Sequence, residues 1–160
     1  MFNKLLDRGI PVDLVKVLVC CYGKCTAVVR WNEGTSRLFN IFAGVRRGGG
    51  GILSPLLFAV YIDDIVFKLE QSGHGCKIRG LFAGCVLYAD DMILLAQTSH
   101  YMQCMLDICQ AEIEALDLHF NVSKSVVKRV GPRWNASCAQ VVLGSVTLKF
   151  RDSIKYLLGI

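Results

Sequence analysis

The stretch GCVLYADDMILLA, residues 84–96, consists of two apolar runs separated by the adjacent acids Asp90 and Asp91. Short runs of β-branched, aromatic and other apolar residues are typical of buried strands, so we predict a β-hairpin with both carboxylates at its turn. Two ionised carboxylates about 4 Å apart repel by roughly 4 kcal/mol at an effective dielectric near 20. A hard divalent cation such as Mg²⁺ (or Mn²⁺) relieves that repulsion. The alternative is a solvated turn, because aspartate is common in turns.

Helices are predicted on both sides of this hairpin. Upstream, Ser54 as N-cap and Pro55 at the first helical position begin a helix that continues to about Glu70 and ends at Gly73. Downstream, Ser99 caps a second helix. The apolar residues of this second helix recur at helical spacing, as expected where one face packs on a core: Met102, Met105, Leu106, Cys109, Ile113 and Leu116.

A second Tyr-x-Asp-Asp run, Tyr61 to Asp64, lies inside the upstream helix. We assign its two acids, Asp63 and Asp64, to structure or solvent rather than to catalysis, because a motif depends on its structural context. The apolar residues around this run have helical spacing and do not form two short strands: Leu57, Val60, Ile65 and Leu69.

The N-terminal part predicts a helix, a turn and a helix, followed by a hairpin. Residues 2–22 carry helically spaced apolar positions on both sides of a break at residues 9–11, where Pro11 suits the start of the second helix. Residues 25–31 and 36–42 have strand-like composition and flank turn residues. Nothing on this hairpin looks reactive, so we interpret it as scaffold.

Residues 44–51 predict an irregular loop, because Gly48 to Gly51 bury nothing and lose much entropy on ordering. Backbone amides without side chains can approach a base or a phosphate closely, and Arg46 and Arg47 supply positive charge. A nucleic-acid or nucleotide contact is therefore chemically reasonable. A flexible linker is the alternative.

Positive charge is concentrated in the last quarter of the chain. The net charge is +5, and Asp152 is the one acid in residues 120–160, where strands are predicted at 126–127, 140–143, 146–150 and 154–158. A polyanion lying across this part of the chain is one interpretation, and a solvated basic face is the other. The cations expected to contact phosphates are Lys124, Lys128, Arg129, Arg133, Lys149, Arg151 and Lys155.

The amino-acid composition limits the class of protein to which this chain can belong. Apolar residues make up 53% of the chain and the mean hydropathy is +0.44, which suggests a piece of a larger core. No segment reaches the ~20 apolar residues of a membrane span, and no signal peptide is visible, so we expect an intracellular protein, nuclear or cytoplasmic, without a membrane partner. The eight cysteines are expected to be reduced thiols, and the three histidines lack zinc-site spacing.

Four motifs occur in one order along the chain, and together they resemble the reverse transcriptases of non-LTR (LINE-like) retrotransposons. The resemblance extends from Gly44 to Gly159 and is therefore nearly chain-wide. Its motifs are Gly44-Val45-Arg46 followed by Leu53 to Phe58, then Tyr88 to Asp91, then Phe120-Asn121 with Lys124, and finally Ile154 to Leu157 with Gly159.

This resemblance implies an α+β, palm-like fold, with helices packed on a small, mostly antiparallel sheet. It implies RNA-directed DNA synthesis by a two-metal mechanism, with an RNA template, a DNA primer and deoxynucleotides as partners. Asp90 and Asp91 are then catalytic metal ligands, and Lys124 lies near the leaving pyrophosphate. The residues expected to bind nucleic acid or nucleotide are Arg46, Arg47, Gly48, Ser54, Pro55, Tyr88, Lys128, Arg129, Lys155 and Tyr156.

In the family a further aspartate comes from a palm strand that precedes the segment beginning here at Phe2. We therefore expect residues 1–160 to be one partial fingers and palm domain, an incomplete polymerase domain that is inactive alone. Two alternatives stay open: a non-catalytic nucleic-acid-binding remnant, and a structural relic of a decayed element.

Overall fold

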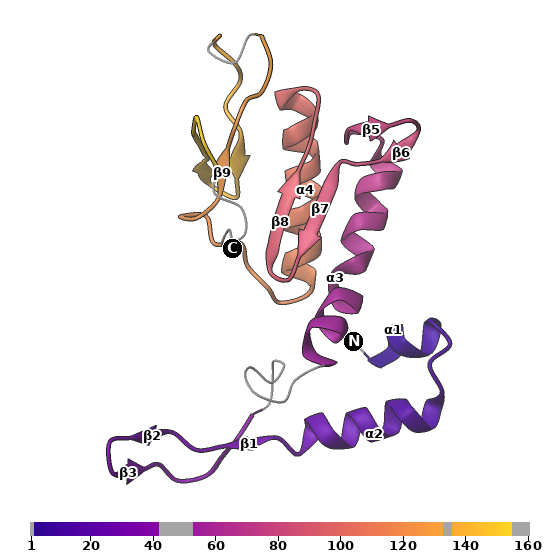
Figure 1. The fold of residues 1–160 in the computed structure, drawn as a ribbon, viewed down its shortest axis with the longest axis vertical. Coiled ribbons are helices and arrows are strands. Elements are labelled where there is room, and N and C mark those ends of the chain that lie inside the picture. The colour runs from indigo at the N-terminus through magenta and orange to yellow at the C-terminus, as the bar shows by residue number, and fades with distance from the viewer. Residues whose placement is uncertain (1, 42–52, 133–135, 155–160) are drawn as a thin grey trace. The chain divides into compact units, whose positions relative to one another are not determined.

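The computed structural model describes residues 2–41, 53–132 and 136–154 (Figure 1). Residue contacts divide the chain into two compact units, Met1–Tyr61 and Ile62–Ile160. The predicted loop at 44–51 and most of the predicted final strand lie outside the described residues, and Ile154 itself is not in a strand. Five of the predicted binding residues also lie outside them: Arg46, Arg47, Gly48, Lys155 and Tyr156.

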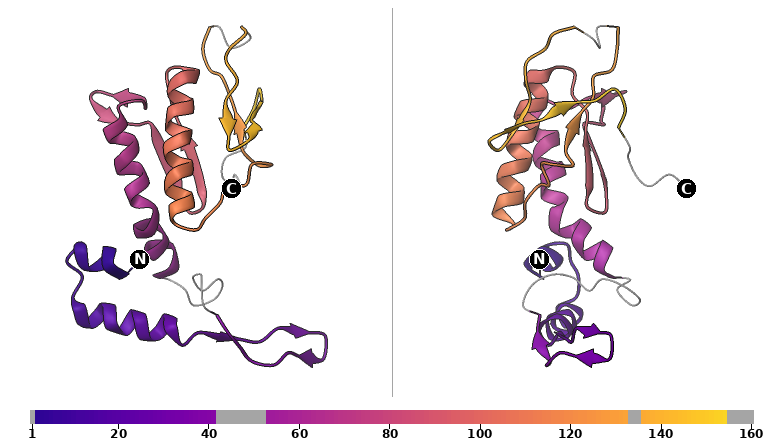
Figure 2. Two further views of the ribbon diagram at one scale, coloured as in Figure 1. Left: turned by 180° about the vertical axis from the view of Figure 1, so that it is seen from behind. Right: turned by 90° about the vertical axis from the view of Figure 1, so that its left-hand side faces the viewer.

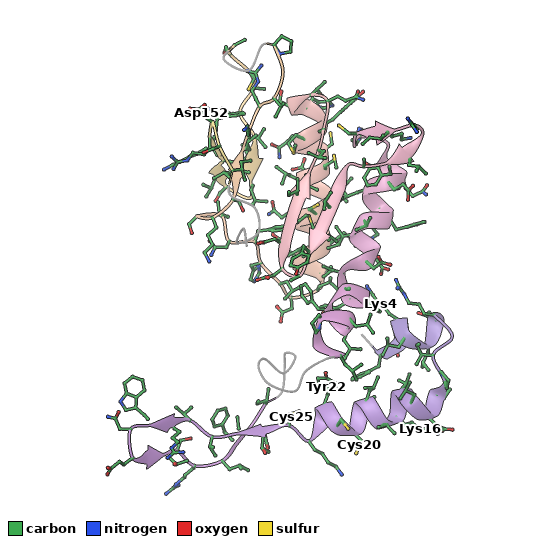
Figure 3. The ribbon with its side chains drawn as sticks, in the orientation of Figure 1. Lys4, Lys16, Cys20, Tyr22, Cys25 and Asp152 are labelled. Atoms are coloured by element: carbon green, nitrogen blue, oxygen red, sulfur yellow. The ribbon has the colours of Figure 1, made fainter. Side chains whose placement is uncertain are left out.

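The first unit begins with the predicted pair of helices, α1 (Phe2–Asp7) and α2 (Val12–Gly23). Pro11 occupies the N-cap position of α2, as its fixed φ and missing N–H allow. The Lys4 ammonium reaches from α1 and donates a 2.8 Å hydrogen bond to the carbonyl oxygen of Tyr61 (Figure 3). The core of this unit is small: buried Leu5, Val15 and Leu57, with partly buried Phe2, Ile10, Leu18, Tyr22 and Val60 around them.

The predicted N-terminal hairpin is present, but it forms two short ladders. β1 (Thr26–Ala27) pairs with β4 (Phe39–Asn40), and β2 (Arg30–Trp31) pairs with β3 (Gly34–Thr35), both antiparallel. The register shifts by one residue between the two ladders, as at a β-bulge. Ser36 bridges the gap: its hydroxyl accepts from the Val29 N–H and its own N–H donates to the Val29 carbonyl, each at 2.8 Å.

Helix α3 (Leu53–Ser72) is the predicted upstream helix. It begins one residue before Ser54, so the prediction that Ser54 caps the helix is wrong, and Ser54 and Pro55 both lie in the first turn. Local capping preferences locate a helix end only to within a residue or two. The predicted end is confirmed, because Gly73 follows the helix with a φ of +73° that favours glycine.

Helix α4 (Ser99–Ala115) is the predicted downstream helix, but its N-cap is Thr98 rather than Ser99. The Thr98 hydroxyl accepts a 3.0 Å hydrogen bond from the N–H of Tyr101. Both residues suit a cap chemically, and the backbone decides between them, because Thr98 is extended and Ser99 is already helical. On the predicted apolar face, Met105, Cys109 and Ile113 are buried.

The strands of the second unit are short. They are β5 (Lys77–Ile78), β6 (Leu81–Phe82), β7 (Cys85–Tyr88), β8 (Asp91–Leu94), β9 (Val126–Val127), β10 (Val142–Leu143), β11 (Val146–Thr147) and β12 (Lys149–Phe150). All described ladders are antiparallel except that of β9 with β12, which is parallel. The strand predicted at 146–150 is therefore two strands with different partners. Helices with small, mostly antiparallel ladders confirm the α+β class.

Within the second unit, α4 lies beside both α3 and the β7–β8 hairpin (Figures 1 and 2). Lys68 on α3 donates to a carboxylate oxygen of Glu112 on α4 at 2.6 Å. The Cys109 thiol on α4 donates to the Met92 sulfur on β8 at 3.6 Å. Ile65 and Leu69 of α3 are buried as well. The hairpin therefore rests on an apolar helical layer.

A second apolar cluster lies under the C-terminal strands. Val141, Leu143 and Leu148 are buried there, with partly buried neighbours that include Met102 and Leu106 of α4. The amide group of Gln103 on α4 both donates to the Val142 carbonyl, at 2.9 Å, and accepts from the Val142 N–H, at 2.7 Å. The side chain of this glutamine therefore satisfies both backbone groups of Val142 in β10.

The cysteines and the helices can be compared with what the sequence predicts. All eight cysteines are free thiols, with Cys25 and Cys109 buried and Cys20 and Cys21 exposed. Within the described residues, the helices are either too short or too polar to cross a membrane.

Candidate active site

The β7–β8 hairpin has a two-residue turn, Ala89 and Asp90, because Tyr88 pairs directly with Asp91. Ala89 has a φ of +50°, in the left-handed region, whereas the φ of Asp90 is not positive. This is the φ pattern of a type II′ turn, whose twist matches that of the flanking strands. The predicted hairpin is confirmed: Asp90 lies in its turn, and Asp91 is the first residue of β8, next to the turn.

The two faces of this hairpin differ in environment. Cys85, Leu87, Met92 and Leu94 share one face and are partly buried. Tyr88 and Asp91 lie opposite each other on the other face, where both are exposed. Side chains directly opposite in an antiparallel pair have Cβ atoms about 4.5–5.5 Å apart. The hairpin therefore places an aromatic ring and two carboxylates together at an open end.

Asp90 and Asp91 are both exposed, and neither has a hydrogen-bond or ion-pair partner within residues 2–41, 53–132 and 136–154. Their oxygens are therefore available to an external ligand. Adjacent carboxylates with unoccupied oxygens fit the preference of Mg²⁺ for hard ligands. The described residues contain no group of three or more acidic, histidine or cysteine side chains positioned to hold an ion, so these two carboxylates form a partial donor set.

The side chains that pack between the β7–β8 hairpin and α4 are apolar and include the thiols of Cys85 and Cys109. Burial raises the pKa of the Cys85 thiol to about 11, and burial together with the charges of Cys85 and Glu112 raises the pKa of the Cys109 thiol to about 12. Both thiols are therefore protonated at neutral pH and behave as small apolar groups. Cys109 packs the hairpin on α4 through its contact with Met92.

Asp63 and Asp64 have a different setting. They are exposed on the continuous helix α3, next to buried Ile62 and Ile65. The predicted distinction between the two Tyr-x-Asp-Asp runs, helix against hairpin, is confirmed as a difference of structure.

Lys124 is exposed in the turn that precedes β9, where its N–H donates to the Asn121 carbonyl at 3.1 Å. Within the described part of the chain its ammonium makes no ion pair with Asp90 or Asp91. Its predicted place beside a leaving pyrophosphate remains a prediction.

A cleft of about 670 Å³ opens between the chain leading out of β9 and the end of β12. Lys128, Arg129 and Arg151 supply positive charge, and Asp152 is the acid among the lining residues. The Arg129 guanidinium donates to the carbonyl of Ala136 and is held across the cleft. Parallel pairing of Val126 and Val127 with Lys149 and Phe150 brings these distant segments together.

Phe150 also lines this cleft and was not among the predicted site residues. The signal available in the sequence was an aromatic residue between two cations, Lys149-Phe150-Arg151, which is common in surfaces that bind nucleic acid. Lys128, Arg129 and Arg151 are cations predicted to contact phosphates, and the structure brings them into the same cleft.

Comparison with known proteins agrees with this geometry. Residues 2–157 match the reverse transcriptase (RNA-dependent DNA polymerase) family. The chain is 24% identical over 98% of its length to a Pol polyprotein from the type-2 retrotransposable element R2DM of Drosophila melanogaster. It is 25% identical over 71% of its length to a Pol polyprotein from a type-1 R2 element of Nasonia vitripennis. The matched segments cover 15% and 11% of these relatives. The chain belongs to the reverse transcriptase family, in the non-LTR retrotransposon branch that its motifs indicate.

Proposed function

We propose that this chain forms the fingers and palm portion of an RNA-directed DNA polymerase of a retrotransposon. The reaction is nucleotidyl transfer: a primer 3′-hydroxyl attacks the α-phosphate of a deoxynucleotide, and pyrophosphate leaves. The observation that carries this proposal is the pair of exposed carboxylates at the β7–β8 turn, which have no hydrogen-bond or ion-pair partner among the described residues. The family of this chain copies RNA into DNA.

Asp90 and Asp91 are the residues that would hold Mg²⁺ or Mn²⁺. When bound, such ions lower the pKa of the primer hydroxyl and offset charge on the phosphate. The hairpin holds the two carboxylates in place. Its turn has only two residues and it packs on an apolar layer, so the backbone that carries Asp90 and Asp91 has little conformational freedom. Tyr88, directly opposite Asp91, offers its exposed ring to the primer end, and Lys124 would offset charge on the departing pyrophosphate.

The cleft lined by Lys128, Arg129 and Arg151 is proposed to hold the backbone of the RNA template and DNA primer. Backbone contacts fix the register of a nucleic acid without reading its sequence, which suits a polymerase that copies any template. The loop at residues 44–51 and the residues Ser54, Pro55, Lys155 and Tyr156 are proposed as further contacts to the template, primer or deoxynucleotide. Such a reaction belongs inside the cell.

The test uses a chimera in which residues 1–160 replace the matching segment of the Drosophila melanogaster R2 polyprotein. Asp90→Asn should abolish primer extension on an RNA template, because it removes a charged metal ligand. The matched variant Asp63→Asn should change stability alone, since Asp63 lies on the helix. Mn²⁺ binding to the isolated chain, followed by electron paramagnetic resonance, should weaken in Asp90→Asn and persist in Asp63→Asn.

Equal loss of turnover from the two substitutions, at matched folding by circular dichroism, would contradict the assignment of the hairpin as the active site. Undiminished Mn²⁺ binding in a double Asp90→Asn, Asp91→Asn variant would contradict the metal-ligand role.

A further inference from the structure

The hairpin of the first unit is exposed along almost its whole length. Every residue from 28 to 41 is exposed, and Cys25 at the base is buried. In Figures 1 and 2 the hairpin projects from the end of α2. An isolated two-stranded hairpin is marginally stable in water, and a large exposed apolar surface usually has a partner.

Trp31 is the most exposed aromatic residue in the described part of the chain, with 78% of its surface accessible. It pairs with Gly34 in the last pair before the turn. Because glycine has no side chain, nothing on the opposite strand covers the indole on that face. The indole is therefore open to solvent at the tip of the hairpin, where a base can stack on it, and it is not a core residue.

The charges around Trp31 favour an anionic partner. Arg30 is its neighbour on β2. Arg37 lies between β3 and β4, just after Ser36, which bonds to Val29. Neither guanidinium has a hydrogen-bond or ion-pair partner among the described residues. Glu33, in the turn, is the hairpin's acid. Val29 is two residues from Trp31, or about 7 Å along a strand, so Arg37 lies near enough to contact a phosphate that flanks a base on the indole. Arg30 is adjacent to Trp31 on β2, and its side chain projects from the opposite face of the strand.

We propose that residues 26–40 form a single-strand nucleic-acid-binding hairpin, in which Trp31 stacks on an unpaired base and Arg30 and Arg37 contact the flanking phosphates. Any of the bases can stack on an aromatic ring, so such a site has little sequence preference. An arginine adds positive charge, and its planar guanidinium can also stack on a base. The ligand class is that of the proposed function, on which this inference rests. The hairpin belongs to the first compact unit, Met1–Tyr61, whereas the two carboxylates of the β7–β8 turn belong to the second. Residues 26–40 include none of the residues named in the proposed function.

Intrinsic fluorescence tests this directly, because the chain has two tryptophans, Trp31 and Trp134. In a Trp134→Phe background Trp31 is the sole reporter. Titration with single-stranded oligothymidylate or oligouridylate should quench its emission, since a stacked base quenches indole. In parallel, fluorescence anisotropy of a labelled oligonucleotide gives the affinity of each variant without relying on the tryptophan.

Substitutions at Trp31 separate stacking from apolar docking. Trp31→Tyr should keep the affinity within a few-fold, whereas Trp31→Leu should weaken it by about 5- to 100-fold, as expected for one lost base–aromatic stack. The combined change Arg30→Ser and Arg37→Ser should reduce the salt slope by about 1.4. Leu38→Ala, an exposed aliphatic position on the same hairpin, is the matched control and should leave both quantities unchanged.

The proposal is overturned if oligonucleotide binding leaves Trp31 emission unchanged, or if Trp31→Leu binds as tightly as the parent chain. Retention of oligonucleotide affinity in Trp31→Leu with loss in Trp31→Ser would also overturn it, because the contact would then be apolar and would not depend on stacking. Because Asp90→Asn should leave the quenching intact, failure of this inference and failure of the polymerase assignment give different results.

Discussion

Ala89 carries backbone strain at the candidate catalytic turn. Its φ of +50° lies in the region where an L-residue with a Cβ atom pays roughly 1–2 kcal/mol relative to the right-handed conformation. Two other turns of the second unit contain residues with positive φ: Arg79 and Gly80 in the β5–β6 turn, and Gly144 in the β10–β11 turn. Each of those turns includes a glycine, for which a positive φ costs little. In the β7–β8 turn, the residue with positive φ is an alanine. Asn32 in the β2–β3 turn and Arg79 in the β5–β6 turn have similar φ values, +52° and +51°, but asparagine tolerates this region better than alanine does.

Replacement Ala89→Gly should therefore stabilise the second unit by up to about 1 kcal/mol, the relieved strain less the entropy that glycine loses on folding. Chemical denaturation gives the free energy of unfolding. Ala83→Gly is the matched control: the φ of Ala83 is not positive and its N–H donates to the Cys76 carbonyl, so this change should destabilise by roughly 0.5–1 kcal/mol. Destabilisation of similar size in both variants would show that Ala89 is unstrained.

At the scale of elements, the contact between the β7–β8 hairpin and α4 determines how firmly the two carboxylates are held. Cys109 is buried in that contact, where its thiol donates to Met92 on the hairpin. Its pKa is raised from 9.0 to about 12, so the folded state disfavours the thiolate and the unfolded state does not. Above pH 9 the unfolded chain loses this proton before the folded chain does.

The stability of the second unit should consequently fall as pH rises from about 9 to 12, by up to roughly 1.4 kcal/mol per pH unit for this one thiol. Below pH 9 the group contributes no pH dependence. Denaturation curves between pH 8 and 11 should show a smaller slope in Cys109→Ala, while Cys20→Ala, at an exposed position, serves as the control. An unchanged slope in Cys109→Ala would mean that the thiol is not desolvated by the hairpin contact.

At the scale of the whole molecule, the described residues supply two carboxylates and no further acidic side chain beside them. A two-metal mechanism needs more ligands than these. The isolated 160-residue chain should therefore show no primer extension on an RNA template with Mg²⁺ or Mn²⁺. Extension by the purified chain that is lost in Asp90→Asn would overturn this expectation, since it would show that two carboxylates suffice.

Binding should survive in that inactive chain, because phosphate contacts need positive charge and not metal ligands. Affinity for a primer–template duplex should fall with salt at a log–log slope of about −0.9 per phosphate contact on duplex DNA and about −0.7 on single strands. Lys128→Ser with Arg129→Ser, which removes two cations from the cleft, should flatten the slope by roughly one to two units.

The matched control removes the same charge elsewhere: Lys77→Ser with Arg79→Asn, on the exposed β5–β6 hairpin, where asparagine tolerates the positive φ of residue 79. Equal flattening in both pairs would show a general charge effect and no bound polyanion in the cleft.

The sequence by itself determined the features that depend on neighbouring residues. Helical and alternating spacing of apolar side chains separated α3 from the β7–β8 hairpin, and with it one Tyr-x-Asp-Asp run from the other. Gly73 marked a helix end because few other residues adopt its φ. Ser99 was misplaced as a cap because the adjacent hydroxyl residue Thr98 satisfies the same local rule. Ser54 was misplaced because α3 begins at Leu53, one residue before the serine that capping preference selects.

The tertiary structure decided what depends on residues far apart in the chain. The parallel pairing of β9 with β12 joins segments separated by more than twenty residues, and no local pattern specifies a partner at that distance. That pairing brings Phe150 and Arg151 to the same cleft as Lys128. The exposure of Trp31 was likewise not readable from its strand-like setting, because burial is set by what packs against a strand and not by the strand itself.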